Sequence, residues 1–162
     1  MGLQLNTEVS ISDIISLLSL FAIVVGGVFA LVKWNSNVKV RRAEYIDKLY
    51  TKRSDERTRN VLYTFDQTEN WYSLYREDKK FEIEVDDALA FFSYICYLKN
   101  EGLLKKKEFT FFEYDIKRIL NNKQVQYYFK ELNCMAAGGE IPSCYKDLIE
   151  YGKKMGLKEY VF

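Results

Sequence analysis

The chain contains no histidine, and it has only one proline and eight glycines among its 162 residues. Without histidine, the protein lacks the commonest general base and the commonest zinc ligand. The scarcity of helix breakers favours helices over sheets. Because hydrophobic residues make up 48% of the chain and aromatic residues 16%, the sequence can fold around a core and is not typical of disorder.

Cysteine is also scarce. Cys96, Cys134 and Cys144 are an odd number without the spacing of metal ligands. Reduced thiols in a cytoplasmic domain explain them most simply, and free cysteines often act as small buried hydrophobic residues. We therefore expect no disulfide framework, no metal centre and no cofactor.

Catalytic motifs are missing as well. There is no glycine-rich phosphate loop, no GxSxG and no CxxC, and a serine or cysteine nucleophile would lack its usual base. An acidic run, Glu82, Glu84, Asp86 and Asp87, has the ligand type of a hard cation but not the EF-hand spacing. Because the run lies at the start of a predicted helix, its favourable interaction with the helix dipole explains it better than a bound cation does. Whether the run binds a cation stays open. We predict that the protein is not an enzyme.

Charge is absent from residues 14–32, IISLLSLFAIVVGGVFALV. As a helix, these residues extend about 28 Å, close to the hydrocarbon thickness of a bilayer. A cleaved signal peptide is the main alternative, but it needs a basic N-terminal region and a small-residue cleavage site. A buried core helix is rarely apolar all round over this length. We therefore predict a transmembrane helix over 14–32.

Basic residues are concentrated directly after this run. Residues 1–32 have no Lys or Arg, whereas residues 33–59 have nine basic and four acidic residues. The positive-inside rule therefore puts residues 1–13 outside the cytoplasm and the chain that follows the span inside. Residues suited to the membrane flank and to lipid headgroups are Lys33, Trp34, Lys39, Arg41 and Arg42.

Small residues line one face of the predicted span. Ala22, Gly26 and Ala30 recur every four residues, with Ser19 near the same face. Such spacing lets two helix backbones approach closely, although small residues are common in spans in any case. We predict self-association through this face, and therefore a homo-oligomer in the bilayer.

The pattern of apolar residues in the rest of the chain predicts helices. Residues 33–53 form a basic amphipathic juxtamembrane helix, and 54–162 form a helical cytoplasmic domain. Within it, the apolar spacing predicts helices from Ser54, from Asp86 to Asn100, over 105–120 and 123–132, and after Ser143. The secondary structure of residues 71–84 remains ambiguous, and residues 135–141 are predicted to form a loop. The expected fold is all-α, a transmembrane helix followed by a compact bundle of five or six helices.

Aromatic side chains and the basic flank together raise the alternative of nucleic-acid binding by stacking. However, the aromatic residues recur at helical spacing in segments with no basic excess, so core packing explains them better. We expect no nucleic acid partner.

Four blocks of this sequence resemble an uncharacterised family of small bacterial single-span membrane proteins with an aromatic-rich helical cytoplasmic domain. They are RRAEYIDKLY (41–50), FFSYICYLKN (91–100), FFEYDIKRIL (111–120) and NKQVQYYF (122–129). The likeness covers most of residues 33–152 and implies the same architecture. It implies no catalytic residue.

These observations favour a membrane-anchored interaction domain that recruits a partner protein or self-associates at the inner leaflet. Two alternatives remain. One is a membrane-disrupting toxin or anti-phage effector that acts by oligomerisation of its span, and the other is an enzyme of unrecognised type.

Overall fold

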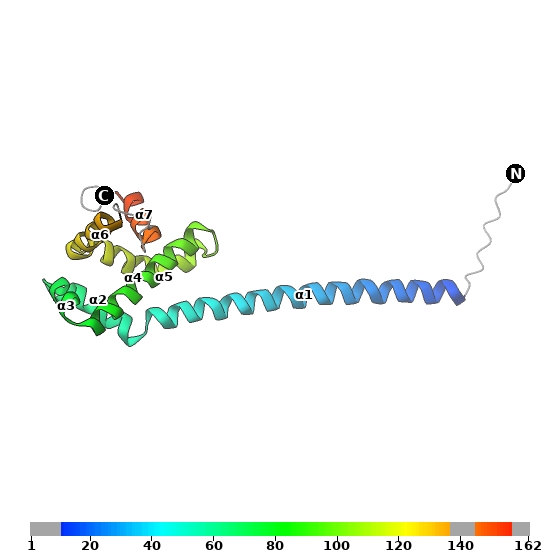
Figure 1. The fold of residues 1–162 in the computed structure, drawn as a ribbon. Coiled ribbons are helices and arrows are strands. Elements are labelled where there is room, and N and C mark those ends of the chain that lie inside the picture. The colour runs from blue at the N-terminus through cyan, green and yellow to red at the C-terminus, as the bar shows by residue number, and fades with distance from the viewer. Residues whose placement is uncertain (1–10, 137–144, 157–162) are drawn as a thin grey trace. The chain divides into compact units, whose positions relative to one another are not determined.

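The computed structural model describes residues 11–136 and 145–156, and every element in these ranges is a helix (Figure 1). The predicted all-α class is confirmed for this part of the chain. The chain divides into two compact units, 1–46 and 47–162, and we call residues 47–162 the helical domain. The helices in chain order are α1 (Ile11–Arg53), α2 (Glu56–Gln67), α3 (Trp71–Glu77), α4 (Lys79–Asn100), α5 (Lys106–Asn121), α6 (Lys123–Ala136) and α7 (Lys146–Lys154).

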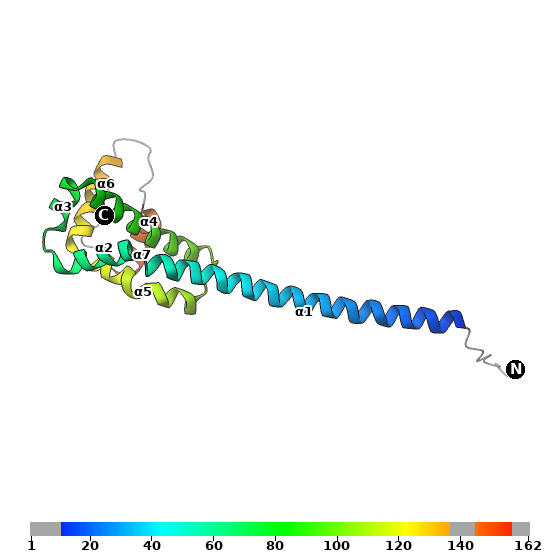
Figure 2. The ribbon, with the colours of Figure 1, turned by 90° about the horizontal axis from the view of Figure 1, so that it is seen from below.

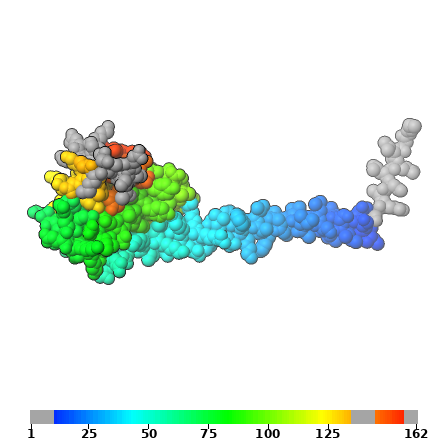
Figure 3. Space-filling view, in the orientation of Figure 1, coloured from blue at the N-terminus to red at the C-terminus, as the bar shows by residue number. Residues whose placement is uncertain are grey.

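α1 is one uninterrupted helix that contains all of residues 14–32. Every residue from 11 to 40 is exposed, including large apolar side chains such as Phe21 and Leu31, which are 68% and 70% exposed. In the space-filling view, the blue part of the chain, which includes residues 14–32, has its side chains on the surface (Figure 3). Among the described helices, α1 alone is long and apolar enough, by length and composition, to cross a membrane.

α4 forms the centre of the helical domain. It packs most extensively against α7 and α2, and it also contacts α3 and α5. Figures 1 and 2 both show α2 to α7 gathered around it. Its apolar residues recur at helical spacing on more than one face, which suits a helix with neighbours on several sides. The fully buried residues of the domain include Val61, Trp71, Val85, Leu89, Phe92, Ile95, Phe112, Ile116, Ile119, Val125, Phe129 and Leu148.

The predicted start of the central helix is wrong by about two turns. α4 begins at Lys79, where the side chain of Asp78 accepts hydrogen bonds from the backbone N–H groups of Lys80 and Phe81. This N-cap satisfies donors that the helix start would otherwise leave unpaired. Asp86 therefore lies inside the helix. The predicted end of this helix at Asn100 is confirmed, and Gly102 follows it with a φ of +68°, a conformation that favours glycine.

Other helix ends also differ from the predictions. α2 is preceded by Asp55 rather than Ser54 as its N-cap residue. The ambiguous stretch from Trp71 forms the short helix α3. α6 continues to Ala136, beyond its predicted end at Leu132. The remainder of the predicted loop after residue 136, and the predicted cap at Ser143, lie outside the described residues.

Candidate functional site: an arginine and tyrosine groove

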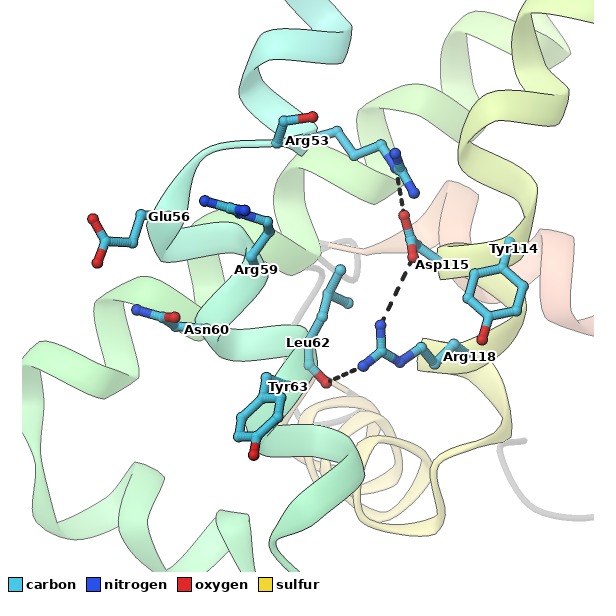
Figure 4. A pocket seen from close by; sticks show the side chains of 10 residues that line it. Arg53, Glu56, Arg59, Asn60, Leu62, Tyr63, Tyr114, Asp115 and Arg118 are labelled. Atoms are coloured by element: carbon cyan, nitrogen blue, oxygen red, sulfur yellow. Dashed lines mark hydrogen bonds and ion pairs between the residues drawn. The ribbon is translucent and has the colours of Figure 1, made fainter.

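An open groove of about 620 Å³ lies in the helical domain where the C-terminal end of α1 meets α2 and α5 (Figure 4). Its volume falls in the range of small-molecule sites. We call it the arginine–tyrosine groove. It is lined by Arg53, Ser54, Glu56, Arg59, Asn60, Leu62, Tyr63, Tyr114, Asp115 and Arg118.

Asp115 is the buried charge at the base of this groove, with a side chain only 4% exposed. Arg53 Nε donates a hydrogen bond to Asp115 Oδ2 at 2.6 Å. Arg118 Nη1 lies 3.9 Å from the other carboxylate oxygen, and the two guanidinium groups approach Asp115 from opposite sides (Figure 4). A buried carboxylate needs such partners, because an unpaired charge is costly to remove from water.

Arg118 also connects α5 with α2. Its Nη2 donates to the backbone carbonyl of Leu62 at 3.0 Å and pairs with the carboxylate of Asp66. The hydrogen bond to Asp66 is the main reason that the pKa of Arg118 lies above its usual value, so the group is always charged. Its Nε is buried and has no hydrogen-bond partner among the described residues.

Two tyrosines stand on opposite walls of the groove, Tyr63 on α2 and Tyr114 on α5 (Figure 4). They are 64% and 70% exposed, although tyrosine usually buries much of its ring. Arg59 is also exposed. Neither tyrosine hydroxyl has a hydrogen-bond partner in the described part of the chain, and Arg59 has no ion-pair partner there. These groups are therefore available to a ligand.

The exposed aromatic surface continues beyond the groove. Arg53 lies 5.6 Å from the ring centroid of Tyr50, and Tyr50 contacts the ring of Phe111 edge-on. Phe111 is 56% exposed. Tyrosine and arginine are the residue types that most often dominate binding surfaces, so this face has the composition of an interaction site.

A second polar cluster joins four helical segments around Asp86. The hydroxyls of Tyr128 and Tyr145 each donate to Asp86 Oδ1 at 2.9 Å, and Tyr75 lies 3.3 Å from the same oxygen. Burial is the main reason that the pKa values of these three tyrosines lie above the usual value, so all three hydroxyls stay protonated. The cluster is satisfied within the domain, which indicates a structural role.

The acidic run offers no cation site in the described residues, where no group of three or more potential metal-ligating side chains comes together. Asp86 is occupied by tyrosine hydroxyls, and Glu84 lies 4.0 Å from Lys80. Of this run, Glu82 lies in the first turn of α4, whereas Glu84, Asp86 and Asp87 lie further along the helix, so the predicted N-terminal position holds for Glu82 alone.

The residues singled out in the sequence all lie on α1. Lys33, Trp34, Lys39 and Arg41 are exposed, and Arg42 is half-buried. The small residues Ser19, Ala22, Gly26 and Ala30 are all exposed on the same helix. None of these nine residues lines the arginine–tyrosine groove.

The groove itself was missed by the sequence analysis. A signal was present, because Asp115 and Arg118 follow Phe112 at the three-residue spacing of the buried stripe of α5. A carboxylate at a core position implies a cation beside it. The partners Arg53 and Asp66 are 62 and 49 to 52 positions away in the sequence at the ends of other helices, so local spacing could not identify them.

Comparisons with protein-family models, curated proteins and solved structures find no match to this chain. The resemblance to small bacterial single-span proteins therefore stays a prediction, and the function has to be argued from the chain itself.

Proposed function

We propose that the protein is a membrane-anchored interaction domain, held at the bacterial inner membrane by residues 14–32 with the helical domain in the cytoplasm. The observation that carries this proposal is the complete exposure of the apolar run. None of that part of α1 is buried by other residues that the structure describes, and an apolar surface of this extent is expected to be covered by lipid or protein.

The helical domain supports the same proposal because its core is complete without the apolar run. The large side chains Trp71, Phe92, Phe112 and Phe129 are fully buried among α2 to α7 and the end of α1. Residues 14–32 are thus not needed to fill the core, and a bilayer is the environment that suits them.

Charge substitution tests the anchor directly. We expect wild-type protein to stay in the membrane pellet of bacterial cells after alkaline carbonate extraction. The double variant Val24→Lys/Val25→Lys should be lost from it, because each charge at the centre of a span costs about 3 kcal/mol. The matched control Val24→Leu/Val25→Leu should stay in the pellet. Release of the wild-type chain by carbonate would contradict the anchor.

The proposal includes self-association of the span, so that the first partner of the anchored domain is a second copy of the chain. A Cβ added at Gly26 or Gly27 would meet nothing within 4 Å, so both positions are open on the helix surface. Only Gly26 shares the face of Ser19, Ala22 and Ala30. We therefore expect Gly26→Leu to reduce energy transfer between labelled copies in membranes and Gly27→Leu to leave it unchanged. Equal effects of the two variants would argue against this face.

A further inference from the structure

We propose that the arginine–tyrosine groove binds a nucleotide, with its phosphate held by Arg53 and Arg59 and its base stacked on Tyr63 or Tyr114. The proposal is independent of the membrane anchor, because every residue that lines the groove lies outside residues 14–32.

The groove has an excess of hydrogen-bond donors. Arg53 uses Nε to pair with Asp115, and its two terminal nitrogens have no partner in residues 11–136 and 145–156. Arg59 offers a second guanidinium without a partner there. Arginine pairs with phosphate through two parallel charge-assisted hydrogen bonds. The groove is therefore suited to a ligand that carries an anionic, acceptor-rich group.

Arg53 is already oriented before a ligand binds. Its bond to the buried carboxylate of Asp115 fixes the guanidinium at the base of the groove (Figure 4). A donor that is held in place before binding loses less conformational entropy when the ligand arrives. Asp115 in turn is fixed by α5, so the anion-binding end of the groove rests on regular helices rather than on a loop.

The groove also contains two exposed tyrosines. Tyr63 on α2 and Tyr114 on α5 line it together with the arginines, and both residues are mostly exposed. Stacking of a base on an aromatic ring tolerates any base, since each base has a flat π-face. A planar ring attached to a phosphate therefore fits this lining better than phosphate alone.

Two further polar groups match the remaining parts of a nucleotide. The amide of Asn60 can both donate to and accept from the edge of a base. The carboxylate of Glu56, which is exposed on the first turn of α2, can accept hydrogen bonds from sugar hydroxyls, as acidic residues do in dinucleotide sites. The volume of about 620 Å³ accommodates a mononucleotide.

Equilibrium dialysis of the full chain in phosphatidylcholine nanodiscs tests the proposal, with radiolabelled AMP, GMP, CMP, UMP, ATP and GTP as probes. We expect at least one of them to bind at a concentration below about 1 mM. Arg59→Ala should weaken that binding about tenfold or more, because a charge-assisted contact is lost. The matched control Arg57→Ala, which changes an exposed arginine of α2 outside the groove, should bind as the wild type does.

The stacking surface is tested with a second pair of variants. Tyr63→Leu/Tyr114→Leu should weaken binding about tenfold. Tyr94→Leu/Tyr97→Leu, which removes two stacked exposed tyrosines of α4 outside the groove, should not. Unchanged thermal unfolding of all variants would confirm that the helical domain is intact.

Three results would overturn the proposal. One is no binding of any of the six nucleotides at about 1 mM, and another is equal binding by wild type and Arg59→Ala. The third is competition by inorganic phosphate, or by phosphatidic acid in the nanodiscs, at the same concentration as the nucleotide itself, because the base would then contribute nothing. A negative result for nucleotide binding would not contradict the proposed membrane anchor.

Discussion

Arg53, the last residue of α1, donates a hydrogen bond of 2.6 Å to Asp115, a buried carboxylate on α5. This contact joins positions 62 residues apart. It fixes the end of α1 against the core of the helical domain and also orients one guanidinium in the arginine–tyrosine groove. Stability of the domain and geometry of the groove thus depend on the same carboxylate.

Removing this carboxylate should destabilise the domain. Asp115→Ala leaves two guanidinium groups without their shared partner, and we expect a loss of about 2 kcal/mol in the free energy of unfolding. Urea unfolding of the full chain in detergent, followed by Trp71 fluorescence in a Trp34→Phe background, measures the change. The control Glu113→Gln removes the ion pair with Lys117 on the same helix but keeps an oxygen that can accept the hydrogen bond from Tyr151, so it should cost less than about 1 kcal/mol. Similar losses for the two variants would mean that Asp115 has no special role.

The aromatic core gives a second test. Phe92 and Phe112 are fully buried, and replacing either with alanine should cost about 3–5 kcal/mol in the same assay. Phe111 is adjacent to Phe112 but 56% exposed, so Phe111→Ala should cost far less. If Phe111→Ala proved as costly as Phe112→Ala, the assignment of the buried face of α5 would be wrong.

The tyrosine cluster around Asp86 predicts instability at alkaline pH. Burial raises the pKa of Tyr128 and Tyr145 in the folded state above the usual value of about 10. Their contribution to stability is complete below pH 10 and declines above it, because the unfolded chain then loses protons that the folded chain retains. Each tyrosine should contribute a slope of about 1.4 kcal/mol per pH unit.

Urea midpoints measured between about pH 8 and 11.5 test this slope. Tyr128→Phe should make the decline shallower, even though it removes a hydrogen bond to Asp86. Tyr63→Phe, which changes an exposed hydroxyl, should not alter it. A decline that is identical in the wild type and Tyr128→Phe would exclude this tyrosine as its source.

The cysteines should differ in reactivity. Cys96 is fully buried, and burial raises the pKa of its thiol to about 12, whereas Cys134 is exposed on α6. In a Cys144→Ser background, a maleimide should label one thiol in the folded protein and two after denaturation. Labelling of both thiols in the folded state would contradict the packing around α4.

The sequence predicted the helices whose apolar residues repeat without interruption. The helix predicted over 105–120 corresponds to α5, and its buried stripe contains Phe109, Phe112, Ile116 and Ile119. Helical spacing alone determines which of these residues share a face. The start of α4 was placed wrongly at Asp86. The acidic run there suggested a helix N-terminus, while the actual N-cap, Asp78, lies in a charged stretch with no apolar pattern.

The arginine–tyrosine groove could not be predicted from local sequence patterns, for a different physical reason. A groove exists only where separate helices meet, and its residues come from the end of α1, α2 and α5. Core packing was predicted for the aromatic residues as a group, and Tyr63 and Tyr114 were not distinguished from the rest. Their exposure depends on the direction in which each helix packs, which the spacing of apolar residues determines only in part.

Membrane topology is the property on which the proposed function depends most, and thiol labelling in intact bacterial cells measures it. Two single-site proteins are needed. One retains Cys134 in a Cys144→Ser background, and the other carries Thr7→Cys with Cys134→Ser and Cys144→Ser. We predict that a membrane-impermeant maleimide labels Thr7→Cys in intact cells and labels Cys134 only after the membrane is permeabilised. Labelling of Cys134 in intact cells, or recovery of the chain in the soluble fraction, would contradict a span over residues 14–32 with the helical domain inside.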